Sequence, residues 1–122
     1  RDIIREGHCG ALPESAVPRM ATAQRARDAT LAQSLLDAGR DGAVLIAGNG
    51  HVRRDLGVPV YLHALAPGRT SCAVGILEVE AAMQDPRAYT TGAADAQAPR
   101  YDFAIFTPRT DRPDPCTAFS TR

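Results

Sequence analysis

Three histidines, His8, His51 and His63, are the side chains of this chain best suited to bind a metal or transfer a proton. His51 has the most informative surroundings, because a Gly-Asn-Gly turn at residues 48–50 precedes it. The apolar run at residues 43–47, just before that turn, is typical of a buried parallel strand. Ligands of open α/β sheets bind beyond the carboxyl ends of the strands. His51 is therefore the main candidate, whereas His63 is expected on a helix surface or at a core edge.

Glycines next to two of the histidines give the backbone room to turn and to approach a ligand. Gly48 and Gly50 do so for His51. His8 lies between Gly7 and Gly10 and could reach the same cleft, although a structural role for it is equally open.

Charged residues directly after His51 could complete a binding site. Arg53 and Arg54 could clamp a carboxylate or phosphate, and Asp55 could orient the imidazole. Neighbouring helical positions point about 100° apart, so the two arginines cannot serve one ligand group equally, and the solvated face of a short helix explains at least one of them. Tyr61 is either a ligand or donor phenol, or a half-buried packing residue.

A long helix is predicted from Pro18 to about Ala38, with Gly39 as its left-handed stop. Its apolar stripe also carries polar side chains in the N-terminal half, and buried polar groups need partners or a solvated cleft. We expect them either to form an internal hydrogen-bond network or to border the binding site and orient its ligands. The stripe contains Met20, Leu31, Leu35 and Ala38 together with Gln24, Arg27 and Asp28.

The remaining pattern predicts a partial layered α/β fold, with a mostly parallel central sheet flanked by helices. We expect residues 1–17 to be irregular, residues 81–100 to be a mobile loop with a short helical turn, and residues 108–122 to be an irregular tail. Three strands form a thin sheet, so part of the domain is expected outside this chain. The predicted strands are residues 43–47, 71–80 and 101–107, and the predicted short helices are residues 51–56 and 59–66.

Length and composition exclude several classes of function. The 122 residues suffice for one domain at most, and the chain begins with Arg1 rather than Met, as expected of a piece of a longer protein. The formal charge is zero, with 14 basic and 14 acidic residues, so there is no global field for nucleic acid or anionic lipid. Apolar runs are far shorter than the roughly 20 residues of a membrane span. Common nucleotide, metalloprotease and esterase motifs are absent.

The three cysteines contain no C-x-x-C pair, which argues against a structural zinc site. Cys72 falls in a predicted strand and is expected to be a small buried hydrophobe. Cys9 and Cys116 lie near opposite ends in loop-like sequence. They could pair in an oxidising compartment, or remain free thiols.

Four sequence blocks together resemble the C-terminal half of the ChaN-like haem-binding lipoproteins, which are related to the Tiki and erythromycin-esterase-like proteins. The blocks are EGHCGALPES, AQRARDATLAQ, AGNGHVRRDLGVPVYL and RPDPC. The resemblance implies that residues 1–122 are the C-terminal part of one α/β domain, completed by a missing N-terminal half. It also implies a bacterial envelope protein that binds haem in iron uptake, a homodimer with haem between subunits, and a lipid anchor outside this chain.

The same resemblance leaves two functions open. The wider superfamily carries paired motifs that end in His, and Gly48 to His51 match one of them; the other, of Gly-Glu-x-x-His type, is not present, and Glu6-Gly7-His8 is not its equivalent. One reading is a haem-binding protein rather than an enzyme, with His51 at the iron and Arg53 or Arg54 near a propionate. The alternative is a hydrolase in which His51 binds a divalent ion, and a structural His51 is the remaining possibility.

Overall fold

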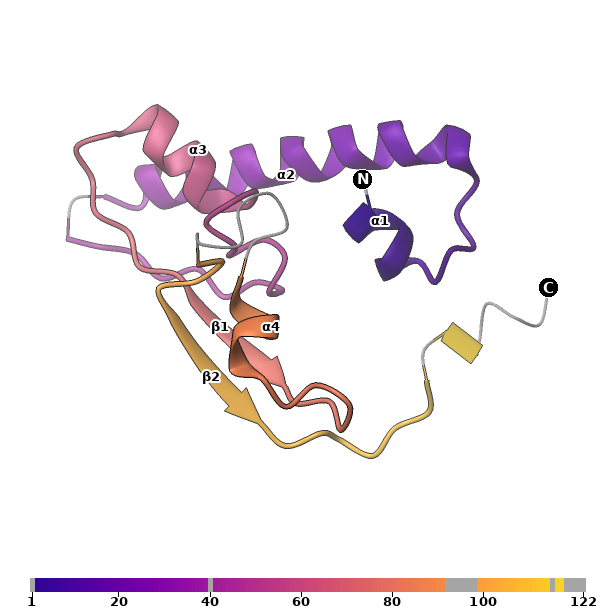
Figure 1. Cartoon of the computed structure of the whole chain (residues 1–122). Helices are drawn as coiled ribbons and strands as arrows, with labels where there is room; N and C mark the ends of the chain where they lie inside the picture. Colours follow the sequence, from indigo (N-terminus) through magenta and orange to yellow (C-terminus); the bar gives the residue numbers. More distant parts are fainter. Residues whose placement is uncertain (1, 40, 92–98, 115, 118–122) are drawn as a thin grey trace. The chain divides into compact units, whose positions relative to one another are not determined.

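The computed structural model of the chain describes residues 2–39, 41–91, 99–114 and 116–117. These residues form helices and a parallel pair of strands, which confirms the α/β class (Figure 1). The chain divides into two compact units, one made of Arg1–Arg27 with Thr110–Arg122 and the other of Asp28–Arg109. In chain order the elements are α1 (Asp2–Gly7), the 3-10 turn η1 (Glu14–Ala16), α2 (Val17–Asp37), α3 (Val58–Leu65), β1 (Val74–Glu78), α4 (Pro86–Thr90) and β2 (Phe103–Thr107).

Helix α2 agrees with the predicted helix to within one residue at each end. Pro18 occupies its first turn, where no intrahelical N–H bond is lost. Gly39 follows with φ of +110°, a conformation that ends helices and that glycine adopts without a Cβ penalty. The buried positions of α2 are Val17, Asp28 and Ala32, and the last two lie four residues apart and therefore on one face of the helix.

Strands β1 and β2 are parallel neighbours, with Val74 opposite Phe103 and Glu78 opposite Thr107 (Figure 1). Both predicted strands at residues 71–80 and 101–107 are confirmed, with shorter bounds. The connection between parallel strands must cross over, and α4 lies in it, as the predicted short helical turn of the 81–100 loop. The Asp85 carboxylate caps this helix by accepting from Arg87 N at 2.9 Å. Residues 92–98 of that loop lie outside the described residues.

The prediction of a buried strand at residues 43–47 is wrong for this chain. The segment has no strand structure, and its side chains are largely open, with Val44 90% and Ile46 94% exposed. A strand exists only where a neighbouring backbone completes its hydrogen bonds, and no described strand pairs with this segment. The short helix predicted at residues 51–56 is also wrong, since these residues form turns, whereas the helix predicted at 59–66 is present as α3.

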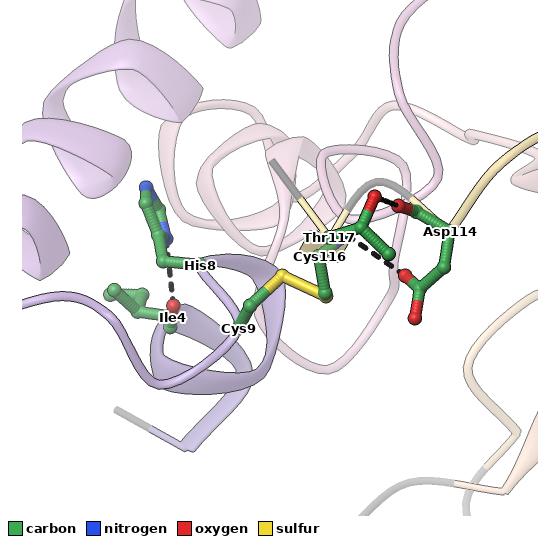
Figure 2. The surroundings of a disulfide bond; sticks show 6 residues. All are labelled: Ile4, His8, Cys9, Asp114, Cys116 and Thr117. Carbon is green, nitrogen blue, oxygen red and sulfur yellow. Dashed lines mark hydrogen bonds between the residues drawn. A yellow bond between two sulfur atoms is a disulfide. The ribbon is translucent and has the colours of Figure 1, made fainter. Parts of the chain in front are cut away.

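The first unit contains a helix where we predicted irregular chain. Gly7 ends α1, and the left-handed residues Cys9 (φ 57°) and Gly10 (φ 69°) follow it, so both glycines lie at or beyond the end of the helix. A disulfide joins Cys9 to Cys116 with a Cα–Cα distance of 5.5 Å (Figure 2). The Asp114 carboxylate accepts from Cys116 N at 2.8 Å and orders the second half of the bridge.

Cys72 differs from expectation, because its thiol is free and exposed rather than buried. It lies just before β1, in a segment with no strand partner. Among the described residues of the chain, no helix is both long enough and apolar enough to cross a membrane.

Candidate functional site

The backbone of His51 is held on both sides. Its amide donates to the Gly48 carbonyl at 2.9 Å, which closes the turn at residues 48–51. Its own carbonyl accepts from the amide of Val58, the first residue of α3, at 2.7 Å. Gly57 makes this close return possible, because a Cβ there would overlap the His51 carbonyl and lie 2.9 Å from the Arg53 carbonyl oxygen. Gly48 and Gly50 were the glycines expected to matter here, yet Gly57 is the one that the packing of this turn requires.

The imidazole of His51 binds a carboxylate on α2. Its Nδ1 lies 2.6 Å from Oδ1 of Asp28, whose side chain is only 6% exposed, while the His51 side chain is 22% exposed. A carboxylate accepts hydrogen bonds, so Nδ1 carries the hydrogen and Nε2 carries the lone pair that binds metals. A carboxylate behind a ligating histidine fixes both its tautomer and its ring orientation. The arrangement therefore presents one preorganised nitrogen donor.

The two arginines after His51 have different roles. Arg53 is buried and binds the Asp55 carboxylate through Nε at 2.8 Å and through a second nitrogen at 2.5 Å. This hydrogen bond raises the pKa of Arg53 and lowers the pKa of Asp55, while burial of each group opposes the shift. Arg54 is half exposed and binds Asp102 at 2.7 Å. Asp55, which the sequence offered as a partner for the imidazole, thus holds Arg53 instead.

Asn49 is a residue of the turn whose role the sequence analysis missed. Its side chain makes two hydrogen bonds to the backbone of Ile76 in β1. The backbone carbonyl oxygen of Asn49 lies 3.4 Å from the hydroxyl of Tyr101. Tyr101 is 6% exposed, and burial raises its pKa. An asparagine between two glycines after an apolar run was the available signal, because such a residue often bonds backbone near a turn.

A cavity of about 880 Å³ lies beside the turn in the second unit. The residues that line it are mostly apolar, and Gly48, Asn49 and Val52 of the His51 segment are among them. Aliphatic side chains from both flanking helices contribute, namely Leu35 and Leu36 of α2 and Val58 and Leu62 of α3. Its size is within the range of small-molecule and cofactor sites, roughly 300–1,000 Å³.

The other predicted site residues are placed elsewhere or have simpler roles. Tyr61 is partly buried on α3, and His63 is exposed on the same helix. His8 belongs to the first unit, where its Nδ1 donates to the Ile4 carbonyl at 2.7 Å (Figure 2). Gln24 lies on α2, and its buried Oε1 has no hydrogen-bond partner among the described residues. In that part of the chain there is also no group of three or more His, Cys, Asp or Glu side chains that could hold a metal ion.

The fold and the site define a mixed α/β protein segment in which a histidine is fixed in a turn, and neighbours of that histidine, though not His51 itself, line an apolar cavity. The family model described as "Haem-binding uptake, Tiki superfamily, ChaN" matches residues 1–62, and the chain belongs to this family. The match contains three of the four blocks on which the resemblance was based, including the His51 turn; RPDPC lies beyond it. The comparisons found no matching curated protein and no matching solved structure.

Proposed function

We propose that this chain carries a haem-binding site in which His51 is the protein ligand of the iron. The observation that carries the proposal is the 2.6 Å hydrogen bond between His51 Nδ1 and Asp28. It directs the metal-binding lone pair to Nε2 and fixes the orientation of the ring, as the partners of ligating histidines do. The family description, haem-binding uptake, supports haem as the group bound.

The residues present fit the chemistry of haem. A porphyrin needs a wide apolar surface, and the cavity beside the turn offers Val44, Ile46 and Val74 among its lining residues. Haem propionates need a cation. Arg54 suits this role better than Arg53, because the Arg53 side chain is 8% exposed and already holds Asp55 through two nitrogens, whereas the Arg54 side chain is 49% exposed. Bound haem would supply redox-active iron, and the chain would supply a fixed donor and an apolar surface.

The cellular location and the assembly that we propose rest on family membership alone. A haem-uptake protein of a bacterium meets its ligand at the cell envelope, so we place this chain there, in the periplasm or at the outer membrane. We further propose that a lipid anchor and an N-terminal half of the same domain lie outside residues 1–122, and that two copies share the haem. Tyr61 and His8 remain candidates for contacts with the group in that assembly.

A hemin titration tests the proposed ligand. Addition of ferric haem to the full chain is expected to shift the Soret band, and His51→Ala is expected to weaken binding at least tenfold, because the nitrogen that would bind the iron is lost. The matched control is His63→Ala, which removes an exposed histidine from α3 and should leave the titration unchanged. Equal affinity in the two variants would exclude His51 as the ligand, and the absence of any Soret shift would exclude the haem site.

A divalent-metal hydrolase is the second candidate, because a carboxylate behind a histidine is also the arrangement that orients zinc ligands. In this case His51 would bind the ion together with residues from outside this chain. Metal analysis of the longer protein is then expected to find one bound divalent ion, and His51→Ala is expected to remove it. Metal content that is the same in both proteins would contradict this role.

A further inference from the structure

Asn49 is the only asparagine in the chain, and its side chain binds the middle of β1. Nδ2 donates to the Ile76 carbonyl oxygen at 2.6 Å, and Oδ1 accepts from the Ile76 amide at 3.2 Å. We propose that Asn49 is the positioning residue of the site, and that its amide replaces a strand neighbour for Ile76 and fixes the His51 turn to the sheet. This inference rests on the proposed function, since it concerns how His51 is presented to the iron.

Asn49 binds the edge of β1 that faces away from β2. In a parallel ladder the N–H and C=O groups of one residue point to the same side, and successive residues alternate. Bonds with β2 use the odd-numbered positions of this stretch: Phe103 N donates to Ala73 O at 3.2 Å, and Val79 N donates to Thr107 O at 3.0 Å. Ile76 therefore directs its N–H and C=O away from β2, and the Asn49 amide satisfies both groups.

An asparagine side chain is chemically suited to this position. Its planar amide carries one donor and one acceptor side by side, which matches the N–H and C=O of a single extended residue. Ionised aspartate has no donor, and its charge would face the Ile76 carbonyl oxygen. Glutamine has the same groups but is one methylene longer. Among uncharged side chains of this length, only asparagine offers both groups to Ile76.

A second contact holds the backbone of Asn49. The Tyr101 hydroxyl lies 3.4 Å from the Asn49 carbonyl oxygen. The Tyr101 ring packs directly on Gly75, where an added Cβ would lie 2.9 Å from ring carbons. Tyr101 thereby ties the same turn to Gly75, the residue of β1 that precedes Ile76. Side chain and backbone of Asn49 are both anchored, two residues before His51.

Three elements thus converge on the turn: α2 through Asp28, α3 through Val58 and β1 through Asn49. Loss of the Asn49 amide removes the β1 anchor and leaves the N–H and C=O of Ile76 without these partners. The Nε2 lone pair would then sample more orientations, and ligand affinity would fall about tenfold, as is usual when a group that orients a metal ligand is removed.

The first measurement needs no variant. Selective 15N labelling of asparagine in the full chain gives one side-chain NH2 pair, because Asn49 is the sole asparagine. We expect proton shifts displaced from those of a free asparagine amide, slow exchange with water and a nuclear Overhauser contact to Ile76. Shifts of a free asparagine amide, with rapid exchange and without that contact, would overturn the inference.

The second measurement follows the ring of His51 by 15N-histidine NMR and, separately, hemin affinity. Asn49→Asp keeps the size but removes the donor, and Asn49→Ala removes the whole amide. Both are expected to broaden or shift the His51 Nδ1–H signal and to weaken hemin binding about tenfold. Gln84→Glu is the matched control, since it makes the same amide-to-carboxylate change at an exposed position of the second unit.

The two proposals fail in different ways. If the His51 ring signals of both Asn49 variants match those of the wild type, the positioning role is overturned, whatever hemin does. If no protein binds hemin but the Asn49 variants alter the ring signals and Gln84→Glu does not, the haem proposal is wrong and the positioning role stands. The same ring change in Gln84→Glu would show a general effect of charge and would also overturn the inference.

Discussion

One histidine in each unit, His8 and His51, makes a similar hydrogen bond with a different consequence. In the first unit, His8 Nδ1 donates over 2.7 Å to the carbonyl of Ile4, four residues earlier. In the second unit, His51 Nδ1 donates over 2.6 Å to the carboxylate of Asp28, 23 residues earlier on α2. The His8 contact only completes a local turn, whereas the His51 contact joins distant segments and fixes a ring. Only the second arrangement has the form of a ligand site.

The two units also differ in what joins the distant parts of each. In the first unit the Cys9–Cys116 disulfide spans a sequence separation of 107 residues. In the second unit several hydrogen bonds and ion pairs share this role, among them His51–Asp28 and Arg54–Asp102. The first unit should therefore respond to redox conditions, and the second to single substitutions and to pH. Four predictions test this difference.

Removal of the disulfide should have the largest effect. Replacement of Cys9 and Cys116 by Ser is expected to lower the free energy of unfolding by about 4–5 kcal/mol, since the bridge closes a loop of about a hundred residues in the unfolded chain. Urea unfolding of the full chain measures the change. Cys72→Ser is the control and should be neutral, because that thiol is exposed and free. If the double variant is as stable as the wild type, the disulfide does not stabilise the first unit.

Gly57→Ala should be the most damaging single change near His51. The new methyl group would overlap the His51 carbonyl, and a backbone neighbour cannot move aside as a flexible side chain can. We expect a loss of about 3 kcal/mol in unfolding free energy. Gly50→Ala, whose Cβ would meet no atom within 4 Å, should change stability by less than about 0.5 kcal/mol. Equal losses in the two variants would mean that Gly57 is not specifically required.

Asp55→Asn should destabilise the second unit in a pH-dependent way. The variant leaves Arg53 buried without its carboxylate, at a cost of about 2 kcal/mol near neutral pH. The pKa of Asp55 is lowered in the folded state from the ordinary 3.8, so the stabilisation is complete above about pH 5 and is lost as the pH falls through the folded-state pKa. Urea midpoints of the two proteins should therefore converge in acid. A constant difference across this range would contradict the assigned pair.

Arg5→Gln should have the smallest effect. Arg5 binds Asp2 and Glu14, and the pair with Glu14 raises the pKa of Arg5, but all three side chains face solvent. Water and salt screen such pairs, so we expect no measurable change in the urea midpoint. Arg53→Gln is the buried counterpart and should lower the midpoint clearly. A marked loss in Arg5→Gln that disappears at high salt would show that ion pairs also stabilise the first unit.

Local signals predicted part of the fold well. The ends of α2 follow from a proline in the first turn and from Gly39 after the last, and both act through their own backbone. The prediction of a strand at residues 43–47 was wrong because a strand forms only beside a neighbouring strand. The same apolar residues, Val44 and Ile46, are exposed when no strand lies beside them. The sequence pattern indicates which secondary structure a segment can form, and pairing with neighbouring segments determines whether it forms.

The site was predicted only in part for a similar reason. His51 was identified from its place after an apolar run, and Asp28 from its place on the inner stripe of α2. Which carboxylate faces the imidazole depends on how distant segments pack, and Arg53 takes up Asp55. The roles of Asn49 and Gly57 depend on a strand 27 residues away and on one backbone overlap. Residue type alone does not indicate such contacts.

Asn49 is also a site of slow deamidation, because it precedes Gly50. Glycine presents little bulk, so its amide nitrogen can attack the asparagine side-chain carbon, expel ammonia and form a succinimide that water opens to aspartate or isoaspartate. While Ile76 holds the Asn49 amide, this ring cannot close, so the reaction proceeds in molecules whose turn has opened. The rate of deamidation therefore reports the fraction of molecules in which the turn has left β1, and deamidation removes the Asn49 donor that binds Ile76.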